Sequence, residues 1–505
     1  MPTIRSGERR LPKVGTLTIL LVLGACLRLV ASIVEKHSFY HFDELYQYFE
    51  QAHRFTFGQG LVPWEWRYGI RSWLLPILLS GPMWVGDILS PTGDLHYLLP
   101  RLTAALFSLG VVWGGYVLGR AISPRHAIVT AFVAAVWFEL VLFGAHVLSE
   151  SLSFTALLLG VGFMSDPARN RSSLAGAALA MSAILRFQYL PAIAVVALLH
   201  RASERRWISF LVGGAAIAAL SAGVDLYMGQ WPFHWFFENV QQNLVNKRSE
   251  NYGVSPAMAY VGDLGRAWSL WILPVIVSLA VIGARRYPVL FVAAVVNLLF
   301  HMLIPHKEYR FIFLTSGIFV LLAAIGSVDV LELLLRRFPI FPPAQTTAAA
   351  LLLWGLVSAA LFAGYHYVGR LAPNYALVKT VADARALPGL CGIVGYQRLP
   401  WRGLSYAVLH RPVPMYNILP ASFSGLRSTP AVAMATIAPS ANALIAPLAL
   451  RADLPPAYQR VSCYSGDVDL ESPICLFVRA GGCDPRNSAR SGAYEVNRQL
   501  VELDH

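Results

Sequence analysis

Charged residues are scarce in this sequence. They make up 13% of the 505 residues, whereas hydrophobic residues make up 56%. A single soluble core cannot enclose so many apolar segments, so the composition excludes an ordinary soluble domain. Lipid must solvate much of the chain.

Long apolar runs recur over most of the length, each near the 15 to 25 residues that cross a bilayer. The first run, Leu17–Val34, is too long for a cleaved signal, and Arg28 in its middle argues the same way. We therefore expect a polytopic membrane protein. The eleven expected spans lie at about 16–34, 98–119, 127–145, 150–165, 173–187, 188–200, 207–228, 267–284, 288–304, 311–334 and 347–367.

Acidic residues are fewer than basic ones, 28 against 40, which gives a net charge of +12. In a soluble protein this excess would suggest nucleic acid. Here the basic residues cluster between apolar runs, where they fix membrane orientation, so we expect no nucleic-acid partner. The positive-inside rule places the following residues in the cytoplasm: Arg5, Arg9, Arg10, Lys13, Arg120, Arg125, Arg169, Arg171, Arg201, Arg205, Arg206, Arg285, Arg286, Arg336 and Arg337.

The spans between successive basic loops come in pairs, as that orientation requires. A crossing by the apolar segment Ser72–Leu89 would invert every later loop. We therefore predict an interfacial or re-entrant helix there, helped by Pro76, Gly81 and Pro82, which break a regular span. Spans 173–187 and 188–200 are short and meet at Arg186, so a broken-helix pair is the alternative to two crossings.

This topology predicts two domains. Residues 1–370 form the membrane domain, with an active-site loop at 37–71, and residues 371–505 form a small soluble α+β domain outside the cytoplasm. Short apolar stretches such as Gly392–Tyr396 and Ile474–Val478 resemble strands. The loop Gly229–Arg266 faces the same side.

Cysteine is rare, with five residues in the whole chain. One of them, Cys26, lies in the first apolar run. The other four lie in the final segment, where an oxidising compartment would allow two disulfides. Four unpaired thiols are the alternative. These four residues are Cys391, Cys463, Cys475 and Cys483.

The first outward loop places two adjacent carboxylates, Asp43 and Glu44, in an aromatic-rich segment. Carboxylates are costly to desolvate there, and one of them is a natural general base. In a regular helix Asp43, Gln47, Glu50 and Arg54 share one face. The alternative is an interfacial amphipathic helix with solvated charges and its aromatic side chains on lipid headgroups.

A second cluster runs from Pro305 to Phe311 and holds three potential cations, His306, Lys307 and Arg310. Cations on the outer face oppose the positive-inside trend. They suit a phosphate at the membrane surface, because arginine binds it bidentately and lysine as a point charge. The alternative is that Lys307 and Arg310 only reach lipid headgroups.

Other signals are weaker. An internal ion pair between Arg28 and Glu139 would explain two charges within spans. The Asp467-Val-Asp469 triplet resembles a metal-nucleotide motif but follows no nucleotide-binding pattern, so we discount it. Further residues expected to support the site or bind substrate are Trp64, Glu65, Arg71, Glu150, Arg186, Tyr252 and Glu308.

These motifs resemble glycosyltransferase family 22, the mannosyltransferases that extend lipid-linked oligosaccharides and GPI anchors, with their bacterial relatives. The resemblance covers about residues 20–330, and Phe42 stands where the family usually has proline. The matching pieces are His41-Phe-Asp-Glu, Trp64-Glu-Trp, Ile70-Arg-Ser with Pro76, Pro100-Arg101, the segment from Asp225 to Gly253, and His306-Lys-Glu-Tyr-Arg-Phe. The last of these resembles the family's His-Lys-Glu-x-Arg-Phe box.

The resemblance implies a mainly α, polytopic GT-C fold that inverts the anomeric carbon at the outer leaflet, with polyprenyl-phosphate mannose or another hexose as donor. The acceptor would be a lipid-linked glycan or glycolipid. Asp43 would be the base, Glu44 would orient the acceptor or share that role, and His306, Lys307 and Arg310 would hold the donor phosphate.

We expect no cofactor, while a divalent metal stays open. The location predicted is the bacterial inner membrane with a periplasmic site, the alternative being the lumenal face of the endoplasmic reticulum. A transporter of a lipid-linked sugar is the competing function. Transporters concentrate their charged sites near the bilayer midplane, whereas most of the candidate residues here are expected at one outer face.

Overall fold

The computed structural model describes residues 14–165, 171–198, 204–337, 342–367, 374–397, 404–420, 429–465 and 472–502. The Asp467-Val-Asp469 triplet and several of the basic loop residues lie outside these ranges. The chain divides into two compact units. The helical unit comprises Met1–Val30, Ala105–Leu220 and Ser249–Ala363, and the mixed unit comprises Ala31–Ala104, Ser221–Arg248 and Gly364–His505.

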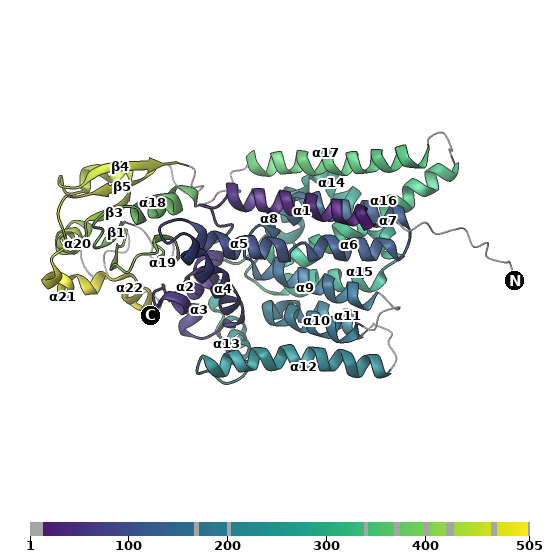
Figure 1. Cartoon of the computed structure of the whole chain (residues 1–505), viewed down its shortest axis with the longest axis horizontal. Coiled ribbons are helices and arrows are strands. Elements are labelled where there is room, and N and C mark those ends of the chain that lie inside the picture. The colour runs from purple at the N-terminus through teal and green to yellow at the C-terminus, as the bar shows by residue number, and fades with distance from the viewer. Residues whose placement is uncertain are drawn as a thin grey trace. The chain divides into compact units, whose positions relative to one another are not determined.

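Long apolar helices dominate the helical unit (Figure 1). The helices that lie wholly or mainly in it are α1 (Val14–Val34), α6 (Gly110–Arg120), α7 (Pro124–Val136), α8 (Phe138–Gly144), α9 (Ser149–Met164), α10 (Ser172–Leu185), η2 (Phe187–Tyr189), α11 (Leu190–Leu198), α12 (Glu204–Tyr227), η4 (Arg248–Tyr252), α14 (Ala259–Ala284), α15 (Pro288–Leu303), η5 (Tyr309–Ile312), α16 (Phe313–Arg337) and α17 (Pro343–Tyr367).

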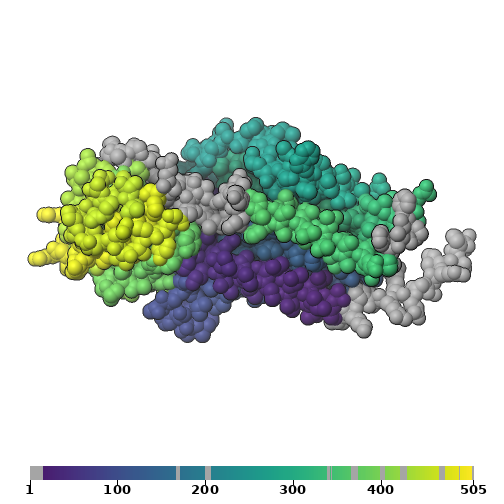
Figure 2. Space-filling model, turned by 90° about the horizontal axis from the view of Figure 1, so that it is seen from above, coloured from purple at the N-terminus to yellow at the C-terminus, as the bar shows by residue number. Residues whose placement is uncertain are grey.

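The protein is a multi-pass membrane protein. Within the described ranges, six helices are long and apolar enough to cross a bilayer, or up to eight if two bent pairs are each one span. Leucines such as Leu352, Leu353 and Leu356 of α17 are exposed, as expected for side chains that face lipid. Figure 2 shows α1 in purple and α17 in green beside each other on one face of this unit.

All eleven expected spans overlap helices, but the number of crossings stays a prediction. The break expected at Arg186 is present, because α10 and the η2–α11 segment are bent by 120° there, while the choice between one crossing and two stays a prediction. A second bend, of 55°, separates α7 from α8 at Trp137. Charged or aromatic side chains thus occupy points where the regular backbone is interrupted.

Close helix contacts in this unit depend on glycine. A Cβ added to Gly283 of α14 would lie 2.1 Å from the Leu322 carbonyl oxygen, and one added to Gly326 of α16 would lie 2.0 Å from that of Leu279. Only hydrogen fits at such distances. Small residues therefore let the two backbones approach closely, as is common between membrane helices.

The expected Arg28–Glu139 ion pair is wrong. The buried Arg28 guanidinium donates to the Ser108 hydroxyl at 3.0 Å and to main-chain carbonyls of α7, including that of Ala134 at 3.0 Å. The Glu139 carboxylate accepts hydrogen bonds from the indole N–H groups of Trp137 and Trp268. Main-chain carbonyls at the α7 end give Arg28 acceptors without an acidic partner.

The mixed unit contains both helices and a sheet. Its helices outside the sheet region are η1 (Glu44–Phe49), α2 (Glu50–Phe57), α3 (Trp64–Arg67), α4 (Leu74–Leu89), α5 (Leu95–Phe107, whose last turn belongs to the helical unit), α13 (His234–Val240) and η3 (Gln241–Val245).

The segment that we expected prolines to break, Ser72–Leu89, forms the continuous helix α4. Pro76 lies in its first turn, where no backbone N–H is needed, and Pro82 is accommodated inside it. The expected helix is therefore present, but the prolines do not interrupt it. Its interfacial position stays a prediction.

The C-terminal part contains the small α+β domain expected from the sequence, and the two expected strands are present as β1 and β5. Five strands run in the order β2-β1-β3-β5-β4, with β1 parallel to β2 and β3, and β5 antiparallel to β3 and β4. Its elements are α18 (Tyr375–Arg385), β1 (Ile393–Tyr396), α19 (Tyr406–Leu409), β2 (Met415–Ile418), α20 (Pro430–Ile437), η8 (Ala438–Ser440), β3 (Ala443–Pro447), η9 (Leu448–Asp453), β4 (Gln459–Tyr464), β5 (Ile474–Val478), η10 (Pro485–Asn487), α21 (Ser488–Ser491), η11 (Gly492–Tyr494) and α22 (Val496–Glu502).

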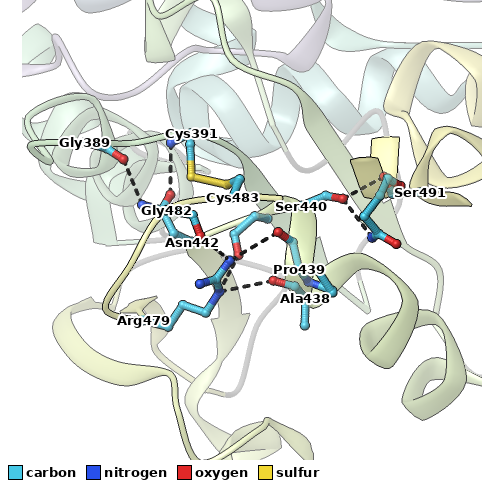
Figure 3. The surroundings of a disulfide bond; sticks show 12 residues. Gly389, Cys391, Ala438, Pro439, Ser440, Asn442, Arg479, Gly482, Cys483 and Ser491 are labelled. Carbon is cyan, nitrogen blue, oxygen red and sulfur yellow. Dashed lines mark hydrogen bonds between the residues drawn. A yellow bond between two sulfur atoms is a disulfide. The ribbon is translucent and has the colours of Figure 1, made fainter. Parts of the chain in front are cut away.

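Both expected disulfides are present, and the structure decides their pairing: Cys391 with Cys483, and Cys463 with Cys475. Around the first, shown in Figure 3, the Asn442 side chain accepts from the Cys391 N–H and donates to the Gly389 carbonyl. The prediction of two bridges is confirmed. The predicted boundary at residues 370 and 371 stays a prediction.

Candidate active site

The helix that carries the acidic motif begins as a π-helix. Element η1 closes with a hydrogen bond from the Glu50 N–H to the Leu45 carbonyl, after which the chain continues as α2. A π-turn holds more residues than an α-turn, so residues spaced for one α-helical face diverge. Gln47 accordingly points to Glu65, whereas Glu50 bonds to Ala407 in the C-terminal part. The expected common face is wrong.

The alternative of solvated charges on an amphipathic helix is also wrong. Glu44 and Glu50 have no exposed area, and Gln47 is 2% exposed. The aromatic side chains Tyr46, Tyr48 and Phe49 of this segment are buried within the mixed unit and do not form an exposed face. Buried carboxylates in such numbers require partners, because desolvation of an unpaired charge is costly.

Asp43 and Glu65 form a neighbouring pair of carboxylates. The Gln47 amide donates to Glu65 Oε1 at 3.0 Å, and the Asp43 side chain keeps 22% of its surface exposed. Burial, together with the negative charge of Asp43, raises the pKa of Glu65 to about 7, while the Arg71 charge opposes the rise. Near neutral pH this pair can therefore hold one proton and one negative charge.

Glu44 has a different environment from its neighbour in sequence. Its carboxylate accepts from the Tyr40 N–H at 2.9 Å and from the buried Arg101 guanidinium at 3.3 Å. Arg101 also donates to the carbonyls of Glu35 and Ser38, at 2.7 and 2.8 Å. These bonds fix the start of the active-site loop, so Glu44 has the contacts of a residue that positions Asp43.

An aromatic and basic group lies in the same unit. The Arg248 guanidinium stacks on the Tyr68 ring, 4.1 Å from its centroid, and donates to the Tyr68 hydroxyl at 2.7 Å. It also lies 5.9 Å from the Trp64 ring centroid. Trp64 thus belongs to a cation–π group that keeps a positive charge near the α3 segment.

The helical unit contains a second cluster, which we call the arginine cluster: Glu150, Arg186, Glu308 and Arg310. Arg186 and Arg310 approach the same oxygen of Glu150, at 3.0 and 3.5 Å, and Arg310 also pairs with Glu308 at 2.5 Å. Both guanidiniums are almost fully buried. Arg310 therefore does not extend to lipid headgroups, and that alternative is wrong for this residue.

The bend between α10 and α11 positions Arg186. Its guanidinium lies 4.7 Å from the Phe311 ring centroid, and its Nε is buried without a hydrogen-bond partner among the described residues. Two buried arginines that share one carboxylate oxygen can offer donors to a further anion.

His306 and Lys307 flank this cluster. His306 contacts Glu308 Oε1 through Nε2 at 3.0 Å and the Gly253 carbonyl through Nδ1, and its ring lies 6.4 Å from that of Tyr252. Burial lowers the pKa of His306, but the hydrogen bonds to Glu308 and to the Gly253 carbonyl, together with the Glu308 charge, outweigh it and raise the pKa above its ordinary value. Lys307 is half-buried, donates to the Ile304 carbonyl, and has a pKa that burial lowers.

The structure thus brings Asp43 together with Glu65 and Arg71, and Arg310 together with Glu150, Arg186 and Glu308. The sequence did not indicate Arg101 as the partner of Glu44, although a charged residue beside Pro100 at the start of an apolar run is the local pattern that could have done so. Residues near Arg186 that the sequence did not indicate are Tyr189, Tyr260 and His301.

A metal site has no visible basis in the described ranges: no group of three or more histidine, cysteine, aspartate or glutamate residues there could hold an ion. The two clusters offer a carboxylate pair that can take up a proton and a set of guanidiniums that can bind an anion.

Comparison with known proteins gives a family match. The model of the Alg9-like mannosyltransferase family matches residues 18–384. The GPI mannosyltransferase 3 of Drosophila melanogaster is 27% identical over 58% of this chain and 53% of its own length. That of Yarrowia lipolytica is 29% identical over 61% of each chain. This chain therefore spans between half and two thirds of the relatives' length.

The fold is similar to that of a solved structure, ArnT from Cupriavidus metallidurans bound to undecaprenyl phosphate. The TM-score is 0.57 at 12% identity, covering 94% of this chain and all of that one. At this identity the likeness concerns the fold alone. It agrees with a mainly α membrane protein of GT-C type that has a small C-terminal α+β domain.

Proposed function

The protein belongs to the Alg9-like mannosyltransferase family, and on that premise we propose that it transfers mannose from a polyprenyl-phosphate carrier to a lipid-linked glycan or glycolipid, with inversion at the anomeric carbon. The observation that carries this proposal is the carboxylate pair of Asp43 and Glu65. A polar pair of this kind can accept the proton that an acceptor hydroxyl loses as it attacks.

Asp43 acts as the general base in this proposal. The acceptor oxygen attacks the anomeric carbon while its proton passes to the Asp43 carboxylate, and the bond from that carbon to the phosphate oxygen breaks. The Glu44–Arg101 pair holds the loop from which Asp43 projects. Glu65 and Arg71 set the local charge around the base.

The arginine cluster holds the departing polyprenyl phosphate. Arg186 and Arg310 supply guanidinium donors that can stabilise the negative charge as the leaving group forms. His306 and Lys307 add charge beside them, and Glu308 keeps Arg310 and His306 oriented. The undecaprenyl phosphate named for the ArnT structure supports a lipid phosphate as the carrier.

The nature of the acceptor is supported by the relatives, which are named GPI mannosyltransferases and hence act on a lipid-anchored glycan. Their names also favour mannose as the sugar over arabinose or another hexose. Trp64 and the Arg248–Tyr68 stack offer aromatic surface of the kind that packs against sugar rings.

We place the site on the extracytoplasmic face of a bacterial inner membrane, with the lumenal face of the endoplasmic reticulum as the alternative. The two disulfides support an oxidising compartment for the C-terminal domain. The active-site loop contacts that domain in the mixed unit: Phe39 donates to Asn374, and Val62 donates to Asn497. Segments packed together in this way share one side of the membrane.

The decisive experiment measures transfer of radiolabelled sugar by purified protein from a panel of polyprenyl-phosphate sugars. We expect mannose to be transferred and Asp43→Asn to lower kcat by at least a hundredfold, because an amide cannot take up the proton. Asp484→Asn, a change at a half-exposed aspartate of the C-terminal domain, is the matched control and should transfer normally.

Full transfer by Asp43→Asn would remove Asp43 from the mechanism. Absence of transfer from any donor by the wild-type protein would contradict the proposed function itself. No observation on the described residues favours a transporter, so we propose only the transferase.

A further inference from the structure

The helix formed by η1 and α2 has a second face besides the one that carries Asp43 and Gln47. This second face contacts the C-terminal domain. Tyr46, Glu50 and His53 follow one another at intervals of four and three residues, and all three are buried. Their polar atoms all contact one short segment of the C-terminal domain, Leu404–His410, which we call the docking segment.

Each of the three side chains contacts a different part of the docking segment. The Tyr46 hydroxyl donates to the Leu404 carbonyl at 3.1 Å. The Glu50 carboxylate accepts from the Ser405 hydroxyl and from the Ala407 N–H at 2.9 Å. His53 Nε2 lies 3.0 Å from His410 Nδ1. The contacts therefore follow the helix for two turns.

The docking segment is itself held from its other side. His410 Nε2 contacts Asp87 of α4 at 2.8 Å. His96 of α5 bonds to the Ala407 carbonyl at 2.8 Å, and its ring stacks on that of His410 with centroids 4.0 Å apart. Arg385 of α18 adds a bond to the Val408 carbonyl at 3.3 Å. The docking segment thus has little freedom to move away from the η1–α2 helix.

Of these three side chains, the Glu50 carboxylate depends most on its hydrogen-bond partners. Its side chain has no exposed area, and it accepts from three donors, the third being the Leu61 N–H at 2.7 Å. A carboxylate has acceptor sites for all three, whereas an amide would turn its NH₂ group toward a donor. Leaving any of these buried donors unpaired is unfavourable.

We propose that the docking segment Leu404–His410 sets the rotation of the η1–α2 helix and thereby holds Asp43 in place for transfer, with Glu50 and Tyr46 as positioning residues. This inference rests on the proposed function. Asp43 and Tyr46 lie three residues apart at the start of one helix, so a rotation that releases Tyr46 also moves Asp43 away from Glu65. Misplacement by about 1 Å can cost about a hundredfold in rate.

The proposal gives the C-terminal domain a part in the reaction. It predicts that the domain acts on the chemical step without touching substrate. The effect should appear in kcat, because the donor phosphate is held by the arginine cluster, to which neither Tyr46 nor Glu50 belongs.

The test compares Tyr46→Phe and Glu50→Gln with a matched control, Tyr458→Phe. The Tyr458 hydroxyl also donates to a buried carbonyl, that of Ala441 in the C-terminal domain, at 2.7 Å. It does not contact the η1–α2 helix. Transfer kinetics are measured together with hydrogen exchange of the peptide that covers residues 44–57.

We expect Tyr46→Phe and Glu50→Gln to lower kcat at least tenfold with the donor KM within twofold of wild type, and to speed exchange in residues 44–57. Tyr458→Phe should change neither. Wild-type kcat in Tyr46→Phe and Glu50→Gln, unchanged exchange in residues 44–57, or an equal loss of kcat in Tyr458→Phe would each overturn the proposal. Hydrogen exchange can be measured even in protein that shows no transfer. A wild-type protein that transfers nothing would therefore contradict the proposed function, and the exchange rates of residues 44–57 would still decide whether the docking contacts hold the helix.

Discussion

Glu44 and Glu65 show how the surroundings of a carboxylate decide what it can do. Glu44 is buried against Arg101 and a backbone N–H, and these two contacts hold its carboxylate in place. Glu65 is half-buried beside Asp43, and that negative charge adds to burial in favouring its protonated form. The first therefore stabilises the loop, and the second can exchange a proton close to neutral pH.

Glu65 predicts a pH dependence of transfer. With its pKa raised to about 7, Glu65 is neutral below that pH and ionised above it. The ionised form places a second negative charge beside Asp43, which strengthens Asp43 as a base, so kcat should rise as the pH increases through about 7. A pH profile of kcat measures the effect.

The other charged or polar groups that face Glu65 are Asp43, Arg71 and the Gln47 amide. Glu65→Gln removes the ionisable group and keeps the size, so its profile should lose the rise near pH 7. An unchanged profile in Glu65→Gln would show that another group controls this limb.

At the scale of elements, the interrupted helices carry the site. The π-turn of η1 separates Gln47 from Glu50, which lets one helix contact Glu65 with one face and the docking segment with another. The 120° bend before η2 projects Arg186 toward Glu150. Interruptions of this kind are frequent at functional sites because they aim side chains that a regular helix would direct elsewhere.

Helix α4 provides a topology test at this scale. If it does not cross the membrane, Thr92, which is exposed after its end, lies on the same side as the C-terminal domain. A Thr92→Cys variant made in a Cys26→Ser background should then react with a membrane-impermeant maleimide from that side only.

Two marker variants fix the sides for this labelling. Ala457 is exposed in the C-terminal domain, and Gln345 is exposed at the start of α17, next to a loop expected in the cytoplasm, so Ala457→Cys and Gln345→Cys serve as the markers. We expect Thr92→Cys to react from the same side of the membrane as Ala457→Cys. Labelling together with Gln345→Cys would mean that α4 crosses the membrane, against the prediction.

At the scale of the whole molecule, two covalent bonds constrain the C-terminal sheet over very different lengths of chain. Cys391 and Cys483 are 92 residues apart, whereas Cys463 and Cys475 are 12 apart. A longer loop loses more conformational entropy when it is closed. The long bridge therefore contributes more to folding in the chain-entropy model.

We expect the double change Cys391→Ser with Cys483→Ser to lower the free energy of unfolding of the sheet by about 4 to 5 kcal/mol, and Cys463→Ser with Cys475→Ser by about 3 kcal/mol. Hydrogen exchange of the β1 and β3 amides measures both. The shorter bridge is the internal control, and a larger loss on its removal would contradict the entropic account.

The sequence alone determined what depends on local composition. Apolar runs of membrane-spanning length predicted the helices, the break at Arg186 and the membrane location, because the affinity of a segment for lipid is close to a sum over its own residues. The His306–Phe311 box led to the family, and four clustered cysteines predicted two bridges.

Only the tertiary structure decided which of those residues meet. It placed Glu65 beside Asp43, Glu150 between Arg186 and Arg310, and the docking segment against Glu50, and it corrected the Arg28–Glu139 pair. Partners separated by tens to hundreds of residues leave no local pattern, because their contacts arise from the packing of whole elements.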